Sequence, residues 1–254
     1  MEIFTYILSF IIGMMLGSFC TLAIHRIPLK QDIIYKHSYC PNCNHKLNFL
    51  DLIPIFSYIF LKVKCRYCNN KIRIRYLLIE ILFGISFMLY TISIKLNILN
   101  LNLSTIIFYF YSIIYITILF IIAGIDKEKI QINFKVILCG LIFELLYIIY
   151  LCIYKGSLIY IYEIIYFLIC LGIILVLTKN KSYMLQIILL YIYIAIYSGT
   201  TLSTLGLIVA LLIYIIKNKI LKIDKSNIPI GYMFSIINIV IIVILNFLKN
   251  YMIN

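Results

Sequence analysis

The 254-residue sequence has no tryptophan, only four prolines and only nine acidic residues, and charged residues make up 12% of it. A soluble domain of this length is about half apolar and about a quarter charged. Here 65% of the residues are hydrophobic and the mean hydropathy is +1.10, so too little polar surface remains to cover a water-soluble globule. This much apolar surface also excludes a disordered chain. The composition predicts an all-α polytopic membrane protein.

Eight apolar runs approach the length of roughly 20 residues that a helix needs to cross a bilayer. The sixth and seventh are short and are separated only by the polar residues 198–201, so residues 183–216 form either one kinked helix or two helices. The first run has no basic segment before it and is expected to stay as a helix rather than be removed as a signal peptide. The eight runs are residues 3–24, 77–95, 104–124, 135–153, 158–178, 183–198, 200–216 and 229–248.

The positive charges are distributed unevenly between the predicted loops. Of the 22 Lys and Arg, 19 fall in loops 25–76, 125–135, 179–182 and 217–228, and the other three are Lys95, Lys155 and Lys249. Basic residues collect in cytoplasmic loops, so both termini are predicted outside and residues 25–76 in the cytoplasm. In a soluble protein the net charge of +13 would suggest nucleic acid; here topology and attraction to anionic lipid explain it better. We therefore predict membrane lipid and no nucleic acid as a partner.

Four of the eight cysteines form two Cys-x-x-Cys pairs. They are Cys40 with Cys43 and Cys65 with Cys68, with 21 residues between the pairs. This spacing is typical of a structural zinc site with four thiolates; the alternative is two disulfides, which a reducing cytoplasm disfavours. The predicted organisation is a first transmembrane helix (1–24), a cytoplasmic zinc-binding loop domain (25–76) and a transmembrane helical bundle (77–254). Cys20, Cys139, Cys152 and Cys170 are expected to be small buried apolar residues, and His25, His37 and His45 to lie at the surface.

A series of short motifs in residues 13–80, in a fixed order, resembles the bacterial type IV prepilin peptidases, which are prepilin leader peptidase/N-methyltransferases. Further along, Ile228-Pro229-Ile230-Gly231 is similar to the Ile-Pro-Phe-Gly sequence that opens the last span in that family. The N-terminal motifs are Gly17-Ser18-Phe19, His25-Arg26-Ile27-Pro28, the first cysteine pair, residues 51–58, the second cysteine pair, Arg75-Tyr76 and Glu80.

The resemblance implies an intramembrane aspartic protease in the bacterial inner membrane. Such an enzyme cleaves the basic leader of type IV prepilins or pseudopilins at the cytoplasmic face and methylates the new N-terminus with S-adenosylmethionine. The protease chemistry needs two carboxylates that share one proton, so that one acts as base and the other as acid.

Only one of the two carboxylates that the resemblance implies is found. Asp126, at the end of the third predicted span, fits the first family aspartate and is the predicted catalytic residue. The second family aspartate belongs to a Gly-x-Gly-Asp motif, whose place at residues 178–183 is taken by Thr-Lys-Asn-Lys-Ser-Tyr. None of the other acids is a convincing partner. Glu144 and Glu163 lie within spans, protonated or paired with tyrosines, and Glu80 is expected to pair with Arg73 or Arg75 at the membrane interface.

Two functional hypotheses follow. The first is a prepilin leader peptidase that uses Asp126 and also methylates its product. The alternative is a degenerate, non-proteolytic relative that serves in pilin binding, methylation or assembly of a pilus or secretion machine. An unrelated transporter is a weaker third reading, because it would not predict the ordered motifs of residues 13–80.

Overall fold

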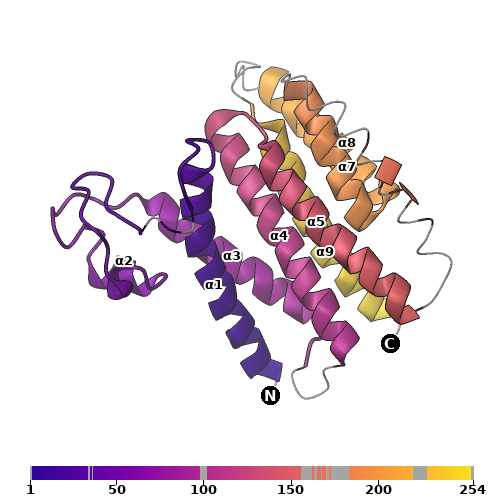
Figure 1. Cartoon of the computed structure of the whole chain (residues 1–254), viewed down its shortest axis with the longest axis horizontal. Helices are drawn as coiled ribbons and strands as arrows, with labels where there is room; N and C mark the ends of the chain where they lie inside the picture. The colour runs from indigo at the N-terminus through magenta and orange to yellow at the C-terminus, as the bar shows by residue number, and fades with distance from the viewer. Residues whose placement is uncertain are drawn as a thin grey trace. The chain divides into compact units, whose positions relative to one another are not determined.

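The computed structural model describes residues 2–33, 35, 37–97, 102–155, 162, 165–166, 168–169, 172, 183–219 and 228–252. Within these ranges every long element is an α-helix, as predicted. A short 3-10 helix, η1 (Phe49–Asp51), and the five-residue helix α2 (Phe56–Phe60) lie in the first loop. The long helices are α1 (Glu2–Arg26), α3 (Ile74–Ser93), α4 (Leu103–Lys129), α5 (Phe134–Lys155), α7 (Tyr183–Ser198), α8 (Thr200–Lys219) and α9 (Ile230–Met252) (Figure 1).

Among the described residues, six helices are long and apolar enough to cross a membrane: α1, α3, α4, α5, α8 and α9. The 16-residue helix α7 is shorter but also apolar. Residues 183–216 therefore form two helices, because Gly199 between them adopts a φ of +83°, which glycine tolerates without steric cost. The predicted span 158–178 lies outside the described residues, apart from isolated helical positions. The all-α polytopic prediction is confirmed.

The chain forms two compact units: residues 1–101 with 246–254, and residues 102–245. In the first unit, α1 packs closely against α3 because glycines replace larger side chains at the contact. A Cβ atom on Gly13 would lie 2.8 Å from the carbonyl oxygen of Phe83, and one on Gly84 would lie 2.7 Å from the ring of Phe10. The hydroxyl groups of Ser9 and Thr91 add a buried hydrogen bond of 2.6 Å across the same contact. This helix pair carries the first loop.

In the second unit, α4 packs on α5, α5 on α7 and α7 on α8. Tyrosine rings stack across these helices, Tyr115 on Tyr197 with ring centroids 3.7 Å apart and Tyr111 on Tyr147 at 4.1 Å. Glu144 of α5 is 1% exposed, and neither of its carboxylate oxygens has a hydrogen-bond partner among the described residues. The predicted pairing of Glu144 with a tyrosine is therefore not formed there, and Glu163 lies outside the described residues.

Candidate functional site

The two Cys-x-x-Cys segments of the first unit fold alike. In each, the residue after the second cysteine, Asn44 or Asn69, has a φ of 57°, and its N–H donates to the carbonyl of the first cysteine, Cys40 or Cys65. An antiparallel bridge flanks each turn, Tyr39 with Lys46 in one and Lys64 with Lys71 in the other. Asparagine is one of the few residues other than glycine that adopts the left-handed conformation readily. The local sequence therefore forms two equivalent turns, each presenting two sulfurs.

The structure brings the four predicted sulfurs together, as the zinc hypothesis requires. The Sγ atoms of Cys40, Cys43, Cys65 and Cys68 all lie within 4.8 Å of one another, with Cys40 and Cys68 3.9 Å apart and none of the four in a disulfide. A tetrahedral Zn²⁺ with Zn–S bonds of ~2.3 Å would hold its sulfurs about 3.8 Å apart. The donor set and its spacing fit a zinc ion, with no position left open for a substrate.

The pKa of Cys65 suits a metal ligand. Burial of this thiol opposes its ionisation, but backbone N–H groups of Cys68 and Tyr67 donate to its sulfur and lower its pKa to about 7. Hydrogen bonds to the charged form favour that form, and the thiolate is the form that binds metal.

Two polar side chains hold the loop in place, and both belong to the N-terminal motifs described in the sequence analysis. Arg26, 3% exposed, donates to the carbonyl oxygens of Asp32 at 3.0 Å and His37 at 2.9 Å. Asp51 accepts from the hydroxyl of Tyr67 at 3.2 Å and pairs with Arg66 at 3.0 Å. The first side chain fixes the start of the loop to the end of α1, and the second fixes the second cysteine turn to η1.

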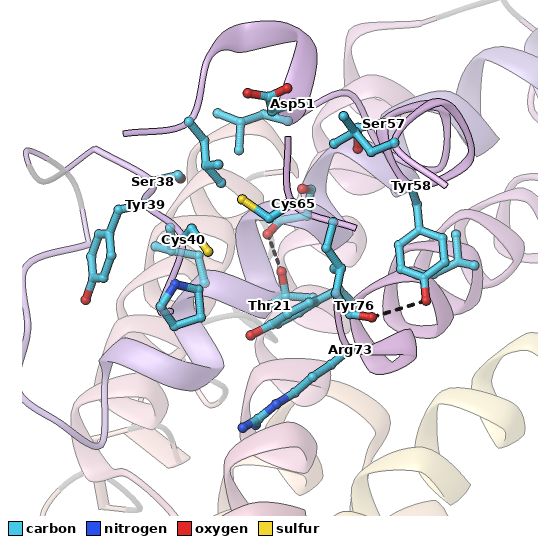
Figure 2. Close-up of a pocket in the computed structure, with 18 of the residues that line it drawn as sticks. Thr21, Ser38, Tyr39, Cys40, Asp51, Ser57, Tyr58, Cys65, Arg73 and Tyr76 are labelled. Atoms are coloured by element: carbon cyan, nitrogen blue, oxygen red, sulfur yellow. Dashed lines mark hydrogen bonds between the residues drawn. The ribbon is translucent and has the colours of Figure 1, made fainter. Parts of the chain in front are cut away.

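A cavity of about 320 Å³ lies between these turns and the ends of α1 and α3. Its size is at the lower end of the range for small-molecule sites. Figure 2 shows Thr21 of α1, Tyr58 of α2 and Tyr76 of α3 around it, with Cys40 and Cys65 on the side of the cysteine cluster. The hydroxyl of Tyr58 donates to the carbonyl of Ile72 at 3.4 Å.

Glu80, which also lines this cavity, does not form the predicted ion pair. Among the described residues its carboxylate instead accepts the backbone N–H of Ile55 at 3.0 Å, and its Cα lies beside Gly17 of α1. In place of the predicted pair with Arg73 or Arg75, the structure gives Glu80 a backbone N–H from the chain before α2 as its partner. The histidine prediction is confirmed, since His25, His37 and His45 are all exposed.

In the second unit, Asp126 lies where the ends of three helices meet. It is fully buried near the end of α4. Its Oδ2 accepts the hydroxyl of Tyr183, the first residue of α7, at 3.0 Å. The same oxygen accepts the backbone N–H of Tyr232, in the first turn of α9, at 2.8 Å. A Cβ atom on Gly231 would lie 3.1 Å from Oδ2, so the glycine of the Ile-Pro-Ile-Gly motif allows this close approach.

The Tyr183 hydroxyl links Asp126 to the start of α9. It donates to Asp126 and accepts the N–H groups of Ile230 at 2.9 Å and Gly231 at 3.2 Å. The sequence analysis assigned no role to Tyr183, although the residue ends the segment that replaces Gly-x-Gly-Asp. Among the described residues no second carboxylate is hydrogen-bonded to Asp126, and Asp224 lies outside them.

Comparison with known proteins finds relatives for the first third of the chain. Residues 11–94 match the family model described as the bacterial peptidase A24 N-terminal domain. The prepilin leader peptidase/N-methyltransferase of Myxococcus xanthus (strain DK1622) is 41% identical over 78 residues, 31% of this chain and 23% of that protein. The protein of the same name from Vibrio cholerae is 37% identical over 102 residues, 37% of this chain and 40% of its own length. The protein of the same name from Bacillus subtilis (strain 168) is 36% identical over 121 residues, which are 46% of this chain and 44% of that protein.

The chain thus spans less than half the length of these curated relatives, and no solved structure matches it. The matched residues contain α3, most of α1 and both cysteine turns, which are the elements around the cavity. Residues 11–94 are therefore similar to the N-terminal domain of the bacterial A24 peptidases, and the described residues contain six helices that are long and apolar enough to cross a membrane.

Proposed function

We propose that this protein acts on type IV prepilins or pseudopilins at the cytoplasmic face of a bacterial inner membrane. The match of residues 11–94 to the peptidase A24 N-terminal domain carries this proposal, because relatives that share this region are named prepilin leader peptidase/N-methyltransferases. The cysteine cluster holds zinc in a structural role. Both termini face outward, and loop 25–76 lies in the cytoplasm.

The contacts of Asp126 support this topology. With eight spans, the end of α4 and the starts of α7 and α9 all belong to the cytoplasmic side. Asp126, Tyr183 and Tyr232 come from these three helix ends, and Asp126 accepts a hydrogen bond from each of the other two.

Leader cleavage is the first of two candidate activities. Asp126 would be the catalytic carboxylate, acting as the base that takes a proton from the attacking water. Its partner would have to hold the second proton and donate it to the leaving amine. In a dyad of two carboxylates that partner is a second acid.

The hydrogen bond from Tyr183 favours the second candidate, a non-proteolytic relative that binds prepilins for methylation or assembly. A phenol ionises near pH 10, so at neutral pH it cannot exchange acid and base roles with Asp126. The hydroxyl and the Tyr232 N–H both bind the same carboxylate oxygen, and they hold Asp126 as a structural contact between α4, α7 and α9.

Co-expression with a cognate prepilin separates the two candidates. We expect no shortened product from the wild type, with an active family member cleaving the same prepilin in parallel. Cleavage by the wild type that is lost in Asp126→Ala would establish the protease instead. Tyr183→Asp, with Tyr183→Phe as its matched control, tests whether a carboxylate opposite Asp126 restores cleavage. Because the chain has only nine acids, substitution of Asp224 and Glu163 completes the search for a second acid.

Methylation is the activity that the first unit could support without Asp126. We propose that S-adenosylmethionine binds in the cavity between the cysteine turns, α1 and α3, where buried Glu80 and the hydroxyl of Thr21 offer polar contacts. Transfer of a radioactive methyl group from S-adenosylmethionine to a prepilin that has already been cleaved measures this activity separately from proteolysis. Loss of transfer in Thr21→Val but not in Asp126→Ala is the expected result, and no transfer by the wild type would refute it.

A further inference from the structure

The first loop carries an exposed apolar surface that the cavity and the cysteine cluster do not use. We call it the η1–α2 patch. Its members are Phe49 (78% exposed), Leu50 (61%), Phe56 (54%), Ile59 (63%) and Phe60 (79%). Soluble surfaces rarely expose contiguous apolar patches of this kind without a partner.

The patch is one face of a small amphipathic unit. Phe56, Ile59 and Phe60 are spaced i, i+3 and i+4 and so share one side of α2, and the rings of Phe56 and Phe60 stack with centroids 6.5 Å apart. η1 packs against α2. Ser57 and Tyr58 of α2 line the cavity. The unit therefore has its polar side turned to the loop interior and its aromatic side turned outward.

The two ends of the loop bring the patch close to a membrane. The chain enters the loop from α1, which ends at Arg26, and leaves it into α3, which begins at Ile74, and both helices are membrane spans by length and composition. An aromatic face tethered between two spans has a bilayer surface within reach.

The charges around the patch match an anionic lipid surface. Lys46, Lys62 and Lys64 flank it in the sequence and are exposed. Residues 25–76 contain ten Lys and Arg but only two acids, and one of these, Asp51, is already paired with Arg66. Aromatic side chains with nearby basic residues are the combination that holds amphipathic segments in the headgroup region.

We propose that the η1–α2 patch inserts into the headgroup region of the bilayer surface from which α1 and α3 emerge, with anionic lipid as its partner. This anchoring holds the cysteine turns against the membrane, so that the neighbouring cavity opens at the membrane surface. A substrate segment leaving the bilayer would then meet the cavity without first crossing water. The inference concerns lipid binding and is independent of whether the protein cleaves or methylates prepilins.

The absence of tryptophan from the chain gives a direct test. Phe60→Trp places one fluorophore in the patch of the full-length protein, reconstituted in vesicles of phosphatidylcholine and phosphatidylglycerol. Two control variants have one tryptophan each. Phe4→Trp replaces an exposed side chain near the start of the membrane-spanning helix α1 (Phe4 is 59% exposed), and Tyr35→Trp replaces an exposed side chain of the loop that is not part of the patch (Tyr35 is 86% exposed). The quenchers are lipids brominated on their acyl chains and aqueous acrylamide.

We expect Phe60→Trp to be quenched by brominated lipid to a similar extent as Phe4→Trp, and several times more strongly than Tyr35→Trp. Quenching by acrylamide as strong as that of Tyr35→Trp would overturn the proposal. Protection from both quenchers would also overturn it, because protein and not lipid would then cover the patch. Ile59→Trp repeats the measurement at a second exposed position, and retention of metal on the four cysteines reports that the loop is folded.

The choice of anionic lipid has its own variant. Lys62→Gln combined with Lys64→Gln, in the Phe60→Trp background, removes two charges next to the patch without touching its apolar face. On vesicles containing phosphatidylglycerol, the ratio of inserted to withdrawn loop is expected to fall about fivefold per lysine, with little change on pure phosphatidylcholine. An equal response on both vesicles would refute the charge part of the proposal.

Discussion

Within the described part of the second unit, the Tyr183 hydroxyl is expected to make a strongly stabilising polar contact. It donates to the buried carboxylate of Asp126 and accepts the N–H groups of Ile230 and Gly231, with all three distances between 2.9 and 3.2 Å. Substitution Tyr183→Phe keeps the ring and removes only this oxygen. The change therefore removes three hydrogen bonds and creates almost no cavity.

The expected cost follows from the groups left behind. A hydrogen bond to a charged group contributes about 1.5–3 kcal/mol, and a buried donor without a partner costs about 1–3 kcal/mol. Ile230 and Gly231 are buried, and their N–H groups belong to the first turn of α9, where the helix itself supplies no acceptor. These contributions share one site and do not add fully. We expect Tyr183→Phe to lower the free energy of unfolding by about 3 kcal/mol.

Denaturant unfolding in detergent micelles measures the loss, and Tyr191→Phe is the matched control. Tyr191 lies on the same helix and stacks on Phe234 with ring centroids 6.4 Å apart, but its hydroxyl makes no hydrogen bond within the described residues. Its removal should change the stability by less than about 0.5 kcal/mol. Hydrogen exchange at the Ile230 and Gly231 amides should accelerate in Tyr183→Phe alone.

One result would refute this reasoning. If the two tyrosine variants unfold at the same denaturant concentration and the amides at the start of α9 exchange as in the wild type, the hydroxyl does not link α7 to Asp126. The structural role of Asp126 would then lose its support, and the catalytic role would gain weight.

Three further predictions concern other parts of the chain. Cys65→Ser should abolish stoichiometric zinc binding and make residues 38–72 sensitive to protease, whereas Cys152→Ser should do neither. Zinc displaces the thiol protons, and the pKa is about 7 for Cys65 and about 11 for Cys68, so the zinc affinity of the wild type should fall as the pH drops through the neutral range and fall more steeply below a pH of about 7. A pH-independent affinity would contradict the thiolate site. Gly84→Ala brings a Cβ to 2.7 Å from the ring of Phe10 and should cost about 1–3 kcal/mol of unfolding free energy. Gly172→Ala should change little, because within the described part of the chain no atom beyond the residue's own chain neighbours lies within 4 Å of the added Cβ. Glu144→Gln replaces a buried carboxyl group, which has no hydrogen-bond partner in the described structure, by an amide of similar shape and should not lower stability. A loss above about 1 kcal/mol in the same unfolding assay would show that the carboxyl group has a partner.

Several features could be predicted from the sequence because they depend on local patterns. An apolar run of about 20 residues predicts a membrane-spanning helix whatever its neighbours in the fold, because a backbone in lipid must satisfy its hydrogen bonds internally. The two Cys-x-x-Cys pairs predict a tetrathiolate cluster because each pair forms the same short turn from neighbouring residues. The helix boundary at Gly199 was left open, because composition does not determine which conformation a glycine adopts.

The contacts of acidic residues could not be predicted in this way. Glu80 was expected to pair with nearby arginines, but its carboxylate accepts the backbone N–H of Ile55 instead. Tyr183 lies 57 residues from Asp126 in the chain and Tyr232 lies 106 residues from it, so no spacing rule connects them. The missing Gly-x-Gly-Asp was visible in the sequence, but the group that takes its place was not.

The sequence by itself thus determined the class of protein, the order of most helices, the cysteine cluster and the likeness of its first third to the prepilin peptidases, because these follow from composition, periodicity and short motifs. Only the tertiary structure decided that Asp126 accepts a hydrogen bond from a tyrosine and, within the described residues, has no second carboxylate as a partner, and that an aromatic face of the first loop is left exposed. Both depend on which helix ends and loop faces meet in space. That is set by the packing of the whole unit and not by any local run of residues.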